Sequence, residues 1–197
     1  MITMDCIIRE GNSILKEKCH DVTLPLSNED IEQMESMIDY IFNSIDDEIS
    51  KKYKLRPAVG LAAPQIGKTN KMLVIYCFDE DGNEHFYPMI NPKLISYSEE
   101  MTYLDSGEGC LSVDREVKGY IHRAKRVTVE TYLYLDNKLV FKKLRLKGYV
   151  SIVFQHEYDH LNGILFVDRI DKENPFKVPS NSTPVVFDKS KAEKSEE

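Results

Sequence analysis

The five residues at positions 156–160, which read H-E-Y-D-H, constrain the fold of this chain more than any other segment. Residues four apart in a helix return to within about 40° of one face, so the side chains of His156 and His160 can reach one metal ion. Apolar residues, including Ile152 and Val153, precede the motif along the same stripe. Unpaired polar groups are costly on a buried stripe. The pattern therefore predicts a metal-binding helix that lies in the interior or lines a cleft.

Glu157 directly follows the first histidine, where its carboxylate can exchange a proton with water at the metal without binding the metal itself. An H-E-x-x-H motif is expected by chance in about one in a hundred chains of this composition. Taken alone, the motif therefore also allows a solvated helix face with two surface histidines.

A catalytic metal site of this kind needs a third protein ligand. Asp168 is a candidate downstream of the motif, and no histidine follows His160. Cys110 is the better candidate, because Gly107 and Gly109 flank it and allow the backbone to approach a ligand or substrate closely. Without a metal, such a cysteine would be an inert packed thiol.

The remaining periodicity predicts one helix and two hairpins. Residues 27–51 carry apolar side chains at intervals of three and four after a serine that can cap them, which predicts one amphipathic helix. Residues 71–78 form an apolar run closed by a turn at 79–83, which predicts a strand leading into a hairpin. A second hairpin is predicted at 127–146, with a bulge or a frayed edge at 142–143, where the alternation slips.

The domain organisation follows from where this patterning stops. Residues 1–171 are expected to form a single catalytic domain, which suits a chain of this length. Residues 172–197 contain three prolines, small polar residues and a charged end, and we expect them to form a disordered tail.

The composition indicates which classes of partner and which cellular compartment to expect. The net charge of -7 weighs against a broad nucleic-acid footprint, so no direct nucleic-acid binding is predicted, although a local basic patch is compatible with it. No run approaches the roughly 18 apolar residues of a membrane span. Asp5 and Glu10 stand where a targeting signal would be basic, which favours the cytoplasm. The four cysteines show no paired spacing and are expected to be reduced.

Three segments together resemble the signature motifs of peptide deformylases, in the order found in that family. They are VGLAAPQIG at 59–67, EGCLSV at 108–113 and QHEYDHLNG at 155–163. The resemblance extends over roughly the first 170 residues, and the stretch DREVKGYIHR at 114–123 is similar to the type found in Gram-positive bacteria. The resemblance implies an α+β fold, with antiparallel strands and hairpins around a central helix that carries the HExxH motif.

The resemblance also implies a role for each matching residue. The metal ligands would be Cys110, His156 and His160, with the cysteine bound as thiolate. Glu157 would be the general base and acid, and Gln65 and the backbone N–H of Leu111 would form the oxyanion hole.

Substrate contacts are expected on both sides of the metal. Gly60 would hydrogen-bond the substrate backbone. Gly109 would let the peptide approach the segment around Cys110, residues 107–112, which we call the cysteine loop. An apolar pocket for methionine is expected from Val59 and from three side chains that precede His156 on its face, namely Tyr149, Ile152 and Val153. The alternative is that these side chains are simply core.

The activity implied by the resemblance is hydrolysis of the formyl group on N-terminal formyl-methionine of nascent polypeptides, with release of formate. The implied native metal is Fe(II), with Ni, Co or Zn as replacements, and a thiolate with two imidazoles suits several of these ions. The implied partners are formyl-Met nascent peptides, with transient proximity to the ribosome.

Two other functions share part of the pattern. A zinc endopeptidase also uses H-E-x-x-H, but the H-x-x-G-x-x-H extension is absent after Glu157 and the segments around Gln65 and Cys110 would have no purpose. A blue-copper electron carrier also uses two histidines and a cysteine, but such a site needs no adjacent carboxylate. A globular binding module without metal is the remaining alternative.

Overall fold

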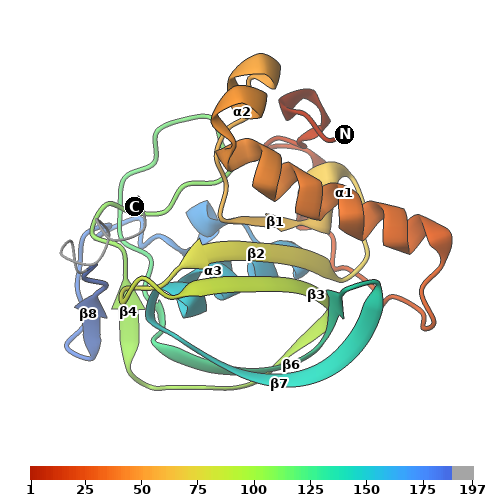
Figure 1. Cartoon of the computed structure of the whole chain (residues 1–197). Helices are drawn as coiled ribbons and strands as arrows, with labels where there is room; N and C mark the ends of the chain where they lie inside the picture. Colours follow the sequence, from red (N-terminus) through yellow and green to blue (C-terminus); the bar gives the residue numbers. More distant parts are fainter. Residues whose placement is uncertain (188–197) are drawn as a thin grey trace.

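The computed structural model describes residues 1–187 and has the predicted α+β fold (Figure 1). The main sheet is antiparallel, with strands in the order β1 (Gly60–Ala62), β2 (Met72–Phe78), β3 (Glu84–Tyr97), β6 (Arg126–Leu135) and β7 (Lys138–Lys147). A smaller sheet has the order β5 (Arg123–Ala124), β4 (Met101–Tyr103) and β8 (Ser182–Pro184), with β8 parallel to β4. The helices are α1 (Asn28–Ile45), α2 (Asp47–Tyr53) and α3 (Gly148–Leu161), with short 3-10 helices η1 (Met4–Cys6), η2 (Ser13–Lys16), η3 (Ala63–Ile66) and η4 (Phe166–Arg169).

The main sheet separates two hydrophobic clusters. Met72 and Val74 of β2 belong to the cluster that contains the buried face of α1, whereas Leu73 and Ile75 belong to the cluster that contains α3. A strand buried on both faces needs a continuous apolar run, which explains the sequence of β2. In Figure 1 the sheet curls around α3, so the helix that carries the H-E-x-x-H motif is enclosed by strands.

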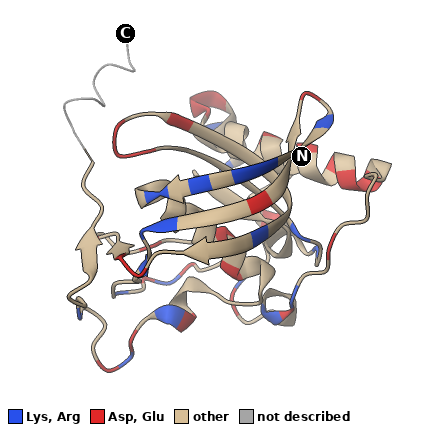
Figure 2. Cartoon of the chain, turned by 90° about the horizontal axis from the view of Figure 1, so that it is seen from below, with Lys and Arg blue, Asp and Glu red and all other residues tan. Residues whose placement is uncertain are grey.

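Both predicted hairpins are confirmed. Strands β2 and β3 pair antiparallel around the turn at 79–83, and β6 pairs with β7 in continuous register from Arg126 and Lys147 to Leu135 and Lys138. The expected bulge or frayed edge at 142–143 is wrong, because Lys142 and Lys143 pair with Thr131 and Glu130 within this register. Strand β7 lies at the edge of the main sheet. Strand β7 has the sequence KLVFKKLRLK, and its Lys and Arg positions are coloured blue in the cartoon of Figure 2. Charge along an edge strand discourages pairing with another chain.

The single helix expected at 27–51 is wrong in one respect, because it is divided in two at Asp46. Ser27 caps α1 as predicted, in a reciprocal capping box with Asp30. Asp46 has extended backbone angles, and its side chain accepts the N–H groups of Glu48 and Ile49. This local hydrogen bonding competes with helix continuation and begins α2 instead. Among residues 1–187, no helix combines the length and apolar character needed to cross a membrane.

The C-terminal segment differs from the expected disordered tail of residues 172–197. Residues 172–187 are placed against the domain: β8 pairs with β4, and the ring of Phe176 packs against Tyr120 at a centroid distance of 5.3 Å. The sequence of this segment has only a weak preference for helix or strand. Its position is set instead by contacts with the rest of the fold, namely the edge of β4 and the ring of Tyr120. The rest of the expected tail, 188–197, lies outside the described residues.

Candidate metal centre

The side chains of Cys110, His156 and His160 converge as the sequence predicted, and their ligand atoms all lie within 4.8 Å of one another. Cys110 Sγ and His160 Nε2 are 3.3 Å apart. Metal–sulfur and metal–nitrogen bonds at a tetrahedral angle would hold these atoms about 3.6 Å apart. The three residues therefore fit a small first-row metal ion.

The pKa values of the two histidines are shifted in opposite directions. Burial lowers the pKa of His160 well below its usual value, and the charge of His156 lowers it further, so His160 is in the neutral form that binds metal. Burial alone would lower the pKa of His156, but its hydrogen bonds to Cys110 and Glu108 raise it well above its usual value. Because only the neutral ring binds a metal, a metal at His156 would have to displace this proton.

Glu157 is buried beside this cluster, and its Oε2 atom has no hydrogen-bond partner in residues 1–187. Burial raises the pKa of this carboxyl to about 7, although the charges of His156 and Arg123 oppose the shift. Gly60 makes room for the carboxylate, since a Cβ at position 60 would lie 2.4 Å from Glu157 Oε1. The carboxyl group is thus held next to Cys110, His156 and His160, which we call the ligand cluster, and its Oε2 atom can accept a hydrogen bond.

Gln65 lies in η3, directly after β1, with its side-chain amide oriented by the backbone. Its Oε1 accepts the N–H of Ala62 at 2.8 Å, which directs Nε2 toward Cys110 Sγ at 3.5 Å and Ser112 Oγ at 3.4 Å. The side-chain amide donor of Gln65 is therefore fixed beside the sulfur of Cys110.

A cavity of about 420 Å³ opens onto these groups. Every site residue expected from the sequence lines the cavity except His160, which is buried; the lining residues are Val59, Gly60, Gln65, Gly109, Cys110, Leu111, Tyr149, Ile152, Val153, His156 and Glu157. Ile152 and Val153 are buried, and Val59 is 40% exposed at the rim. Ile45, Arg56 and Leu104 also line the cavity and were not expected. They come from outside the three motifs, so no local pattern pointed to them.

Comparison with known proteins decides the family. The sequence matches the family model described as polypeptide deformylase over residues 4–176. Peptide deformylase 2 of Bacillus cereus (strain ATCC 14579) is 51% identical over 185 residues, which cover 94% of this chain and 99% of that protein. This chain belongs to the polypeptide deformylase family. Peptide deformylase 2 of Bacillus subtilis (strain 168) is 47% identical, with 94% and 99% of the two chains covered.

Solved structures of the deformylase family share the fold. The peptide deformylase of Thermotoga maritima is 31% identical with a TM-score of 0.61, and the match covers 84% of this chain and 96% of that one. A class I type b peptide deformylase from Acinetobacter baumannii, solved with Met-Ala-Ser bound, is 29% identical with a TM-score of 0.64, over 83% and 96% of the chains.

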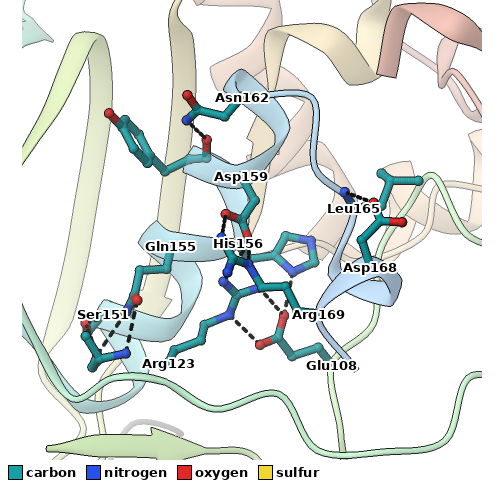
Figure 3. Close-up of polar contacts among 12 residues, drawn as sticks. Glu108, Arg123, Ser151, Gln155, His156, Asp159, Asn162, Leu165, Asp168 and Arg169 are labelled. Atoms are coloured by element: carbon teal, nitrogen blue, oxygen red, sulfur yellow. Dashed lines mark hydrogen bonds and ion pairs between the residues drawn. The ribbon is translucent and has the colours of Figure 1, made fainter. Parts of the chain in front are cut away.

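Behind the ligand cluster of this deformylase lies a buried charge network that the sequence did not reveal (Figure 3). Glu108 Oε2 is 2.8 Å from His156 Nδ1, which leaves Nε2 of this ring for a metal. Arg123 donates to both oxygens of Glu108, at 2.6 and 2.9 Å, and to Asp159 Oδ2 at 2.9 Å. Arg169 of η4 pairs with the same Asp159. Such outer hydrogen bonds fix the orientation of a ligating histidine.

The charges in this network compensate one another. Burial raises the pKa of Glu108, but the guanidinium of Arg123 outweighs it and holds the pKa at about 2. A signal was present in the sequence, because Glu108 and Asp159 lie inside two of the motifs, beside the expected ligands. Their partner Arg123 ends the stretch 114–123, and only the fold reveals that it pairs with both carboxylates.

Asp168, the other candidate for the third ligand, takes no part in the cluster. Its Oδ2 atom accepts a hydrogen bond from Lys16 Nζ at 2.5 Å and another from the N–H of Leu165 at 2.9 Å. It holds η4 in place and is partly exposed.

Proposed function

We propose that this chain removes the formyl group from N-terminal formyl-methionine of nascent polypeptides and releases formate, by hydrolysis at a metal held by Cys110, His156 and His160. Family membership over nearly the whole chain supports the reaction. The observation that carries the metal-dependent assignment is the convergence of these three ligand atoms beside the free oxygen of Glu157.

The proposed resident metal is Fe(II), with Ni, Co or Zn as replacements. When bound, the metal supplies Lewis-acid chemistry that makes water nucleophilic at neutral pH. A site of one thiolate and two imidazoles accepts each of these ions, and supply and geometry select among them. Metal analysis after anaerobic purification tests this proposal, and a protein loaded chiefly with zinc under those conditions would contradict it.

Glu157 is the proposed general base and acid. Its free Oε2 atom can take a proton from the attacking water and pass it to the leaving amine. The raised pKa of about 7 suits both steps near neutral pH, because the group can hold and release a proton. The packing of Gly60 against the carboxyl keeps it aimed at the cavity.

The proposed oxyanion hole consists of Gln65 Nε2 and the backbone N–H of Leu111. The hydrogen bond from Ala62 to Gln65 orients the amide before substrate binds, so no reorganisation is needed as charge develops on the formyl oxygen. Each donor of this kind typically contributes about 2.7–4 kcal/mol to transition-state stabilisation.

The proposed substrate contacts occupy the cavity walls. Gly60 and Gly109 would contact the peptide backbone, and Val59, Tyr149, Ile152 and Val153 would surround the methionine side chain. The Acinetobacter baumannii relative was solved with a peptide that begins with methionine, which supports this class of ligand. A chain that acts on nascent peptides would work in the cytoplasm and come transiently near the ribosome.

Formate release from formyl-Met-Ala-Ser, measured beside cleavage of internal peptide bonds in an unformylated peptide, tests the function. We expect formate and a free amino terminus from the first peptide and no cleavage of the second. The reverse pattern would identify a metallopeptidase, and a blue, redox-active copper form without hydrolysis would indicate electron transfer.

A further inference from the structure

We propose that Phe187, at the end of the docked C-terminal segment, is a positioning residue for substrate selectivity: it supports Tyr149, a wall of the proposed methionine pocket. This inference rests on the proposed function and extends it to a part of the chain outside the three motifs. The ring centroids of Phe187 and Tyr149 are 5.1 Å apart, and the rings meet edge to face at 73°.

The C-terminal segment is held firmly enough to position a side chain. Strand β8 pairs with β4, and Thr102 Oγ1 donates to the carbonyl of Thr183 at 2.8 Å. One residue after β8, the N–H of Val185 donates to the carbonyl of Tyr103 at 2.9 Å. Leu104, the next residue after β4, lines the cavity. The C-terminal segment therefore runs along β4, which leads to Leu104 on one wall of the cavity. The segment then reaches Tyr149, on another wall, through Phe187.

Tyr149 needs such support because it lies at the first turn of α3. Its backbone N–H donates to Glu80 Oε1 at 3.0 Å, which fixes the main chain at the start of the helix. The side chain is only partly buried, with one part on the cavity and another against Phe187. An edge-to-face contact restricts the direction of both rings. Removing Phe187 would let the Tyr149 ring move away from the pocket.

The test compares kcat/KM for formyl-Met-Ala-Ser and formyl-Ala-Ala-Ser in full-length variants. Because the alanine side chain does not reach the wall, Phe187→Ala should lower the Met-to-Ala ratio about 3- to 10-fold, mainly through KM for the methionine peptide. Phe187→Tyr keeps the ring and should keep the ratio. Val186→Ala is the matched control, since Val186 lies in the same segment and is 74% exposed.

A double variant separates action through Tyr149 from a general effect of the segment. In a Tyr149→Leu background, Phe187→Ala should cause no further change in the ratio, because coupled residues are not additive. An unchanged ratio in Phe187→Ala, an equal loss on both peptides, or an undiminished effect in the Tyr149→Leu background would each overturn the proposal.

A failure of the Phe187 proposal can be distinguished from a failure of the proposed function. If the wild-type chain released no formate, the function would be wrong, yet the inference could still be tested by calorimetry of Met-Ala-Ser and Ala-Ala-Ser binding. Phe187→Ala should then reduce the preference for Met-Ala-Ser by a similar factor. Equal preference in the wild type and this variant would overturn the inference.

Discussion

At position 60, the absence of a side chain is what allows the carboxyl group of Glu157, the proposed general base, to occupy its place. A Cβ there would lie within 2.7 Å of three atoms of Glu157, whereas a Cβ at Gly109, on another cavity wall, meets nothing within 4 Å. We expect Gly60→Ala to cost about 1–3 kcal/mol of unfolding free energy through overpacking. Gly109→Ala, the matched control, should leave the melting temperature unchanged. Equal melting temperatures for the two variants would show that the carboxyl group moves aside freely.

Substitutions of Glu157 and Cys110 should differ in their effect on metal content, although both should lower activity. Glu157→Gln preserves the shape of the side chain but removes the base, so activity should fall about 10²- to 10⁴-fold with metal still bound. Cys110→Ala should lose metal and activity together, because it removes one of the three proposed ligands. Metal content and formate release measured on the same samples separate the two roles. Loss of metal from Glu157→Gln would place this carboxyl group in the ligand set.

At the scale of elements, the buried network joins the cysteine loop, β5, α3 and η4. Glu108→Gln removes the negative charge between His156 and Arg123. Changes to such supporting groups typically weaken metal binding about 10- to 100-fold. Competition with a chelator measures this directly. Arg126→Gln, which breaks an exposed pair with Glu100, is the control and should bind metal like the wild type. An unchanged affinity in Glu108→Gln would mean that the network serves folding alone.

The elements also show which parts of the structure could be predicted from sequence. The apolar run of β2 and the periodicity of α1 and α3 reflect burial on defined faces, so local pattern was sufficient. The division of the first helix at Asp46 depends on a side-chain hydrogen bond that competes with a continuous apolar stripe. The docking of β8 depends on a strand edge about 80 residues away in sequence, as the pair Thr102 and Thr183 illustrates. The expected residues of the cavity lay within the motifs or on the helical face before His156, whereas Leu104 and the buried partners Glu108 and Asp159 depend on contacts that local sequence does not show.

At the scale of the whole molecule, acid should remove part of the stability through Asp79. Burial raises the pKa of this carboxyl, but hydrogen bonds from His85 and Asn83 outweigh burial and hold the pKa well below its usual value. A depressed folded-state pKa means that the ionised group stabilises the fold above an unfolded pKa of about 4, and that this contribution is lost as pH falls further. Asp79→Asn should therefore be less stable than the wild type at pH 6, by a difference that shrinks toward pH 3. Denaturant unfolding at the two pH values measures it, and a difference independent of pH would contradict the assignment.

The measurement that tests the central claim most directly is formate release from formyl-Met-Ala-Ser as metal-free protein is titrated anaerobically with Fe(II). The potential ligand atoms of Cys110, His156 and His160 lie within 4.8 Å of one another and form one candidate metal site among the described residues. The rate should be near zero without metal, rise linearly and reach a plateau at one equivalent. Nickel should give the same stoichiometry. Full activity without metal, or a plateau far from one equivalent, would contradict hydrolysis at a single ion held by Cys110, His156 and His160.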